Sequence, residues 1–205
     1  MIRNIVCDMG GVLIEWNPNA IVRRFQLPPE DEALLLREVF QSTEWVAQDR
    51  GVVPQSELLA AMQKRLPERL HDAAAECIYG WWRAPFTPID GMDALLHELK
   101  AQGYALYILS NASRALHDYF PRLPGSDVFD DKFVSADWGL LKPDRSIFQR
   151  FCDEFGLVPE ECYFIDDFAM NVEAAMCFGM RGSVFYRDMQ RLRRELREAG
   201  VNVSL

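Results

Sequence analysis

The feature that most constrains the fold of this chain is a set of three short apolar runs. Each run ends at side chains that are able to bind a ligand. The runs cover residues 2–7, 104–109 and 162–165, and the polar residues directly after them are Asp8, Ser110 with Asn111, and Asp166 with Asp167. Mainly apolar runs of this length are typical of buried strands in a parallel sheet. Ligands of such a sheet bind outside the carboxyl ends of its strands, so we expect these polar residues to converge.

Helical patterns alternate with strands in the second half of the chain. We predict helices over residues 92–103, 144–155 and 171–179, and a helix or helical turn over residues 113–123 that is broken at Pro121. Further strands are predicted over residues 132–137 and 183–186. The alternation predicts an α/β fold, a doubly wound parallel sheet with helices on both faces and right-handed crossovers.

An inserted helical block separates the first strand from this alternation. Its apolar residues recur at three- and four-residue spacing, as at Leu58, Leu59, Met62 and Leu66. The residues that favour helix starts are Asn17, Pro29 and Ser56, and residues 48–51 are predicted to connect two helices. Prolines and a glycine between residues 85 and 91 mark the return to the sheet. We predict a core of residues 1–16 and 85–205 and a small helical domain of residues 17–84.

Composition and charge narrow the classes of partner. No stretch approaches the roughly 20 apolar residues of a membrane helix, and the first apolar run is too short for a signal peptide. We therefore expect a cytoplasmic protein without a membrane partner. Acidic residues outnumber basic ones by 31 to 22, which disfavours nucleic acid as a partner because phosphate contacts need clustered Lys and Arg. The arginine-rich segment 187–198 has the spacing of a solvated amphipathic helix.

The cysteines predict neither a disulfide framework nor a zinc site. There are five of them, an odd number, and no pair has C-x-x-C spacing. Cys7 adjoins Asp8 but lies within an apolar run, so we expect a buried, unreactive thiol.

The adjacent carboxylates of Asp166 and Asp167 indicate a cation. Two such groups at a buried strand end repel each other unless a cation or a proton lies between them. Together with Asp8 they offer only oxygen ligands, which suits Mg²⁺. Lys142 precedes a proline and a predicted helix, where it could neutralise an anion bound beside the metal.

In this order the motifs resemble those of the haloacid dehalogenase-like hydrolase superfamily. The four matching segments are DMGGVL from Asp8, LSN with Ser110, Lys142-Pro143, and IDD with Asn171. The inserted helical block sits where that superfamily places a small cap of the C1 type. More narrowly, the motifs are similar to the glucose-1-phosphatase-like and epoxide-hydrolase-N-domain-like branch.

The resemblance implies a phosphatase acting on a small phosphorylated metabolite, for example a sugar phosphate. Asp8 would attack phosphorus and form an aspartyl-phosphate, with Lys142 offsetting charge on the phosphoryl oxygens. Mg²⁺ would be held by Asp8, the backbone carbonyl of Gly10, and the Asp166-Asp167 pair. The residues implied to bind substrate are Ser110 and Asn111 at the phosphoryl group and Arg50 in the cap, whereas Asn171 would orient the acidic loop.

Gly10 departs from the superfamily pattern. Most of its phosphatases have a second aspartate there, which serves as general acid to the leaving alcohol and then as base for water. Proton transfer of this kind contributes roughly 10²–10⁴-fold to the rate. Glu15, Asp49 or the substrate itself could substitute, and the sequence does not choose among them.

Two other functions remain open from sequence. A 2-haloacid dehalogenase would use the same attack by Asp8 on carbon without a metal, but such a site has little use for two adjacent carboxylates. A weakly active phosphoryl-binding or regulatory protein could have kept the fold after losing the acid at position 10.

Overall fold

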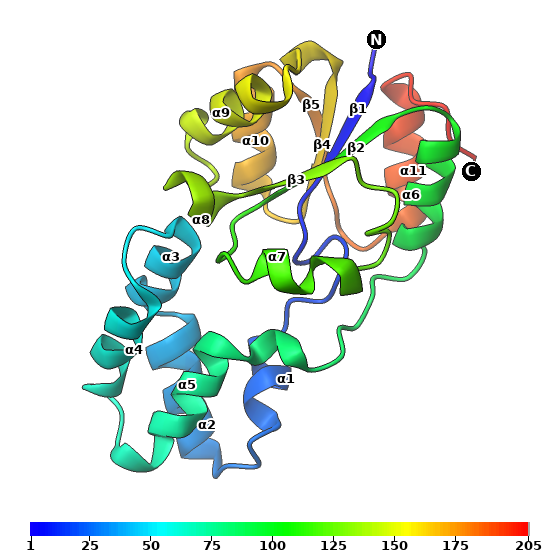
Figure 1. Ribbon diagram of the computed structural model, residues 1–205. Coiled ribbons are helices and arrows are strands. Elements are labelled where there is room, and N and C mark those ends of the chain that lie inside the picture. Colours follow the sequence, from blue (N-terminus) through cyan, green and yellow to red (C-terminus); the bar gives the residue numbers. More distant parts are fainter. Residues whose placement is uncertain (205) are drawn as a thin grey trace.

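The computed structural model of the protein describes residues 1–204 and contains a five-stranded parallel sheet (Figure 1). Its strands are β1 Asn4–Cys7, β2 Ala105–Ser110, β3 Asp131–Val134, β4 Cys162–Asp166 and β5 Arg181–Val184. The strand order is β3-β2-β1-β4-β5, so the chain winds away from the central β1 in both directions. Cys7, the last residue of β1, pairs with Ile108 and with Ile165, which brings the carboxyl ends of three strands to one edge. The predicted doubly wound sheet is confirmed.

Helices cover both faces of the sheet because its strands are apolar on both sides. On one face lie α9 Arg145–Phe155 and α10 Ala169–Phe178, and on the other lie α6 Met92–Ala101 and α11 Met189–Glu198 (Figure 1). Successive side chains of β1 point to opposite faces. Val6 therefore joins the cluster beneath α9 and α10, while Ile5 and Cys7 join the cluster beneath α6 and α11.

The inserted residues form a helical layer beyond the carboxyl ends of the strands (Figure 1). In chain order its elements are α1 Pro18–Arg23, α2 Pro29–Leu35, the π-helical η1 Leu36–Phe40, α3 Thr43–Arg50, α4 Gln55–Gln63, η2 Glu68–Leu70, α5 His71–Tyr79 and η3 Trp81–Arg83. We call this layer the cap. Most of its buried apolar side chains belong to the same hydrophobic cluster as those beneath α6 and α11, so the cap is continuous with the core of the protein.

Local signals explain where the cap helices begin. The Asn17 side chain accepts a hydrogen bond from the backbone N–H of Ala20, 3.1 Å away, and Pro18 occupies the first turn of α1. The helix α2 begins at Pro29 as predicted, but α4 begins at Gln55, one residue before the predicted start at Ser56, with no side-chain cap.

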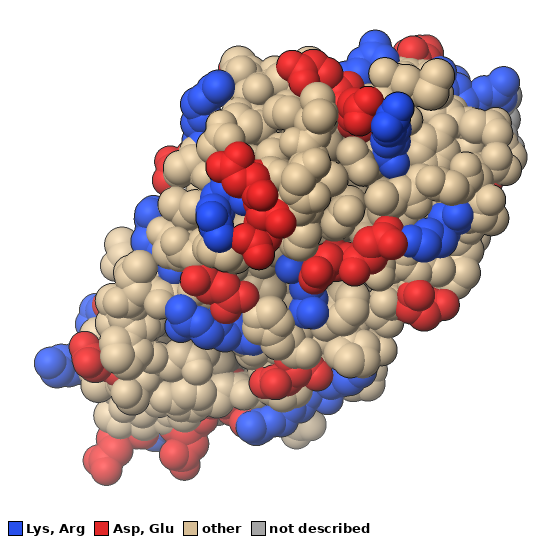
Figure 2. Space-filling model, turned by 45° about the horizontal axis from the view of Figure 1, so that its top comes forward, with Lys and Arg blue, Asp and Glu red and all other residues tan. Residues whose placement is uncertain are grey.

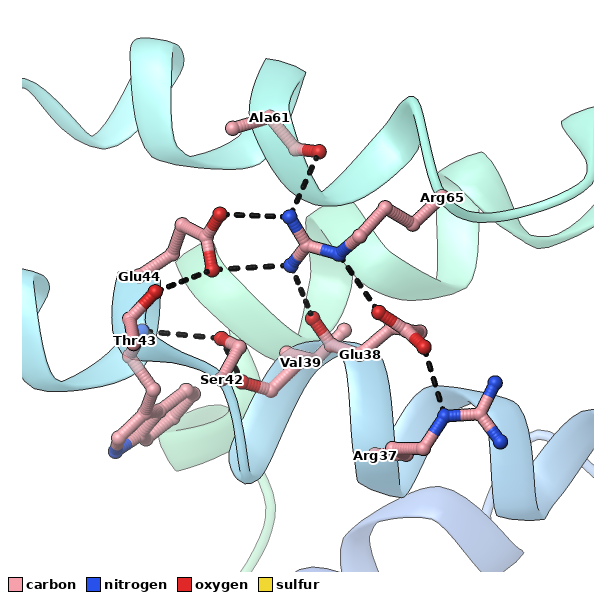
Figure 3. A network of polar contacts seen from close by, with 9 residues as sticks. Arg37, Glu38, Val39, Ser42, Thr43, Glu44, Ala61 and Arg65 are labelled. Atoms are coloured by element: carbon pink, nitrogen blue, oxygen red, sulfur yellow. Dashed lines mark hydrogen bonds and ion pairs between the residues drawn. The ribbon is translucent and has the colours of Figure 1, made fainter.

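Arg65, just beyond α4, holds three cap elements together (Figure 3). Its guanidinium lies 2.7 Å from Glu38 in η1 and 2.7 Å from Glu44 in α3. Hydrogen bonds from Arg37 and then from Arg65 hold the pKa of Glu38 below its usual range, and the hydrogen bond from Arg65 does the same for Glu44, although burial opposes both shifts.

Four sequence expectations differ from the structure. The strand expected over residues 132–137 ends at Val134, and the next residues form the short helix α8 Ser135–Trp138. The last strand lies at residues 181–184 instead of 183–186. The helix or helical turn expected over 113–123 is the short helix α7 Leu116–Tyr119, followed by the 3-10 turn η4 Phe120–Arg122, which contains Pro121. Residues 48–50, expected in a loop, form the last turn of α3, which ends at Gly51 with φ of 73°. At residues 135–137 and 48–50, short polar segments take their form from tertiary contacts instead of periodicity.

A last 3-10 turn, η5 Pro159–Glu161, leads into β4.

The surface of the protein carries charges of both signs. Acidic and basic side chains are interspersed on the face seen in Figure 2. Among the described residues, no helix is both long and apolar enough to cross a membrane.

Candidate active site

Asp8 stands directly after β1 at the central edge of the sheet. Its backbone N–H donates to the carbonyl of Ile165 over 2.9 Å, which continues the ladder between β1 and β4 by one residue. Its side chain is 14% exposed and therefore reaches the surface of the crevice. Burial raises the pKa of Asp8 to about 6, with Lys142 opposing the shift and Asp166 adding to it.

Lys142 is buried between two of the carboxylates. Its Nζ lies 2.6 Å from Asp166 Oδ2 and 3.0 Å from Asp8 Oδ1. Burial alone would lower the pKa of this lysine, but the two carboxylates outweigh burial and hold the pKa above its usual value. Lys142 therefore remains charged, ready to attract an anion bound at Asp8.

Asn111 fixes the backbone of Lys142. Its Nδ2 donates to the carbonyl of Lys142 over 2.9 Å, and its Oδ1 accepts from the backbone N–H of the same residue over 2.8 Å. Both ends of the Asn111 amide are thus engaged in holding the lysine. Ser110, by contrast, lines the crevice with its buried side chain.

The oxygens of Asp166 are already occupied by protein donors. Besides Lys142, they accept from the backbone N–H of Phe168 over 2.8 Å and from Asn171 Nδ2 at 3.0 and 3.1 Å. Asp167, the next residue, is exposed, and partial burial and Asp166 raise its pKa. The two neighbouring carboxylates therefore differ: one is locked in place and the other is accessible.

The acidic cluster has the donor chemistry of a divalent cation site. Asp8, Asp166 and Asp167 each present a carboxylate oxygen, and these oxygens all lie within 4.8 Å of one another. Within residues 1–204, Lys142 is the only basic side chain at ion-pair distance from the three. The cluster therefore carries excess negative charge, and its all-oxygen donor set fits Mg²⁺. Gly11 leaves room for the accessible carboxylate, because a Cβ there would lie 2.1 Å from Asp167 Oδ2.

A cavity of about 280 Å³ opens above this cluster, a size suited to a small molecule. Its floor is formed by the strand-end residues Asp8, Gly10, Ser110, Asn111 and Asp167. Its wall is aromatic and comes from the cap and the core together: Trp16, Trp45, Trp81 and Tyr119. The ring centroids of Trp16 and Trp81 are 4.9 Å apart, and those of Trp81 and Tyr119 are 5.5 Å apart.

The cap turn at the end of α3 reaches this cavity with two residues. Gln48 and Asp49 line it, whereas Arg50, the residue expected from sequence to select substrate, is half-buried outside the lining. A substrate contact of Arg50 thus stays a prediction. Glu15 also lies outside this cavity and pairs with Arg187 over 3.0 Å.

Several lining residues have no individual role predicted from the sequence, although Gln48 belongs to the segment 48–51 that the sequence places between two cap helices. Gln48 is 3% exposed, and its Nε2 has no hydrogen-bond partner within the described structure. Its sequence signal was the polar segment before Gly51, which was assigned to a loop. Trp16 and Trp45 had no signal beyond being aromatic, because core and ligand-facing tryptophans look alike in sequence.

Cys7 is fully buried, and burial together with Asp8 raises its pKa to about 12, as expected of an unreactive thiol.

Comparison with known proteins gives three results. The haloacid dehalogenase-like hydrolase profile matches residues 2–179. The chain is 29% identical over 178 residues to a sesquiterpene phosphatase of Aspergillus oryzae, covering 86% of each chain. It is 28% identical over 163 residues to flavin mononucleotide hydrolase 1 of Arabidopsis thaliana, covering 78% of this chain and 64% of the plant protein.

A similar solved structure is a family enzyme of Bacteroides thetaiotaomicron in complex with magnesium and inorganic phosphate. Its TM-score is 0.66 at 23% identity, and the alignment covers 94% of this chain and 99% of the other. At 23% identity, the similarity between the two structures shows only that they share a fold.

Proposed function

The chain belongs to the haloacid dehalogenase-like hydrolase family, and on that premise we propose that it is a Mg²⁺-dependent phosphatase of a small phosphorylated metabolite. The observation that carries the proposal is the cluster of Asp8, Lys142, Asp166 and Asp167 on the floor of a small-molecule cavity. A nucleophilic carboxylate, a charged lysine and an acidic metal site are the parts that phosphoryl transfer requires.

In the proposed reaction Asp8 attacks phosphorus and forms an aspartyl-phosphate, which water then hydrolyses. Lys142, held by Asp166, offsets charge on the phosphoryl oxygens, and Ser110 donates to them from the end of β2. When bound, Mg²⁺ supplies further positive charge to the same oxygens. We assign its direct protein ligands to Asp8, the carbonyl of Gly10 and Asp167, because the oxygens of Asp166 already accept protein hydrogen bonds.

The aromatic wall supports a leaving group with an apolar face. Trp16, Trp45 and Trp81 surround the space above Asp8, and flat or hydrocarbon groups pack well against such rings. The substrates after which the sesquiterpene phosphatase and the flavin mononucleotide hydrolase are named fit this preference, since a terpene skeleton and a flavin ring are both largely apolar.

A panel of phosphomonoesters, assayed with MgCl₂ and with EDTA, tests the proposal. We expect turnover only with Mg²⁺, and higher kcat/KM for aryl and prenyl monophosphates than for sugar phosphates. The matched variant Asp8→Asn should be folded and inactive. Turnover by Asp8→Asn at the parental rate would refute the nucleophile assignment.

The excess of negative charge in the cluster argues against a metal-free 2-haloacid dehalogenase. That reaction would place a halide near carboxylates that Lys142 alone does not neutralise. Chloride release from chloroacetate, undiminished by EDTA, would reverse this preference.

A further inference from the structure

The phosphatase proposal leaves the leaving alcohol without a proton donor at position 10. Gly10 has no side chain, and a Cβ built there would lie 3.3 Å from the Cβ of Trp16. The aromatic wall thus crowds the space into which an acid at this position would extend. A proton donor supplied by the protein would therefore be another group that faces the cavity.

The cavity lining contains three carboxylic acids, and two of them belong to the acidic cluster. Those two are Asp8, paired with Lys142, and Asp167, the accessible member of the proposed metal site. The third is Asp49, which comes from the opposite side, at the end of α3 in the cap. Glu15, the other acid considered from sequence, points away and pairs with Arg187.

Asp49 is held over the strand ends by contacts to the core. Its carboxylate accepts a hydrogen bond from the backbone N–H of Ser113, three residues after Ser110. Its backbone carbonyl accepts a hydrogen bond of 2.5 Å from Ser135 Oγ, and the same hydroxyl accepts from the N–H of Ala112 over 2.9 Å. Asp49 is therefore tied to the loop that carries the phosphoryl-binding residues.

The surroundings of Asp49 favour its neutral form. Burial and the charge of Asp8 raise its pKa well above the usual range, and the hydrogen bonds from Ser113 and Trp45 oppose the shift without cancelling it. Among the described residues, no basic side chain forms an ion pair with Asp49. An acid whose neutral form is favoured can donate its proton to a leaving group.

We propose that Asp49 is the general acid and base of the reaction, in place of the acid that Gly10 lacks. This assignment rests on the proposed phosphatase function. As an oxygen of Asp8 bonds to phosphorus, the bond from phosphorus to the alcohol oxygen breaks, and that oxygen takes the proton of Asp49. The resulting Asp49 carboxylate then removes a proton from the water that attacks the aspartyl-phosphate at phosphorus. Inorganic phosphate leaves, Asp8 is regenerated, and Asp49 is protonated again.

A leaving-group series in Asp49→Asn tests this role. The substrates are 4-nitrophenyl, phenyl and benzyl phosphate, whose leaving groups are progressively more basic. We expect kcat/KM of the variant to fall by roughly 10²–10⁴-fold for benzyl phosphate and far less for 4-nitrophenyl phosphate, because only a basic leaving group needs the proton. With 4-nitrophenyl phosphate, the variant should also release one equivalent of nitrophenolate in a burst before slow turnover, since hydrolysis of the aspartyl-phosphate has lost its base.

Two further variants separate this role from a structural one. Asp49→Glu should recover part of the benzyl phosphate activity because it keeps a carboxyl group. Glu15→Gln should leave the ratios of kcat/KM among the three substrates unchanged. An equal loss on all three substrates, or no loss on any, would overturn the assignment while leaving the phosphatase function intact. A parent protein inactive on all three would overturn both.

Discussion

At the scale of single residues, the site depends on differences between chemically identical side chains. Asp166 accepts hydrogen bonds from Lys142, Phe168 and Asn171, so it stabilises the lysine instead of facing solvent. Asp167 follows it immediately but is exposed. Asp166 and Asp167 thus have different roles because β4 ends at Asp166 and the backbone turns directly after it.

Gly11 provides a residue-scale prediction about the metal site. It has φ of 76°, and a Cβ there would overlap Asp167 Oδ2. We expect Gly11→Ala to displace that carboxylate and to raise the Mg²⁺ concentration for half-maximal activity by roughly 10-fold or more. The matched control is Gly103→Ala, which has φ of 88° but nothing within 4 Å of the added Cβ.

Both alanine variants carry a backbone strain of about 1–2 kcal/mol, which urea denaturation measures. Only Gly11→Ala should also change the Mg²⁺ dependence. An identical Mg²⁺ dependence in the two variants would contradict the placement of the metal at Asp167.

At the scale of elements, side-chain hydrogen bonds between the cap helices hold the cap together. Arg65 links the end of α4 to η1 and α3, as Figure 3 shows. Ser42 caps α3 by accepting from the N–H of Trp45 over 3.2 Å, which sets where that helix begins. The end of α3, at Gly51, in turn determines how Asp49 approaches the cavity.

We expect Arg65→Met to lower stability by about 1 kcal/mol at neutral pH, or by about 2–4 °C in Tm. Arg37 and then Arg65 lower the pKa of Glu38, and Arg65 lowers that of Glu44. The stabilisation that Arg65 provides is therefore present above the unfolded-state pKa of these acids, roughly 4.3, and is lost as pH falls through their lowered folded-state values. The Tm difference between parent and variant should therefore shrink below about pH 4. A difference that grows on acidification would contradict this account.

At the scale of the whole molecule, the site exists only where cap and core meet. Trp16, Trp45 and Trp81 come from the linker, α3 and η3, while Tyr119 comes from the core helix α7. The two parts approach each other closely at Gly51, where an added Cβ would lie 2.1 Å from the carbonyl oxygen of Ala136 in α8.

Gly51→Ala should therefore push α3 away from α8 and open the cavity. We expect a red shift of tryptophan fluorescence, as the aromatic wall becomes hydrated, and a loss of kcat/KM that is greater for benzyl phosphate than for 4-nitrophenyl phosphate, as Asp49 withdraws. Gly139→Ala is a suitable control, since it has φ of 71° but its Cβ would meet only a Val52 methyl at 3.5 Å. Unchanged fluorescence in Gly51→Ala would contradict the close approach.

The sequence by itself determined the family, the sheet and the strand-end residues. Apolar runs and their polar ends are local patterns, and strands of a parallel sheet must end at a common edge. Asp8, Ser110 and Asp166 could therefore be placed together without a structure. The same local patterns failed at residues 135–137 and 48–50, where short polar segments adopt helical turns against each other.

Only the tertiary structure decided how the remaining residues divide their roles. Asn111 turned out to hold Lys142, and Glu15 to pair with a distant arginine, while Asp49 reached the cavity through contacts with Ser113 and Ser135. Of these contacts, the hydrogen bond that Arg187 donates to Glu15 spans 172 positions of the sequence. Pairings over such distances depend on how cap and core pack, which no local pattern of residues records.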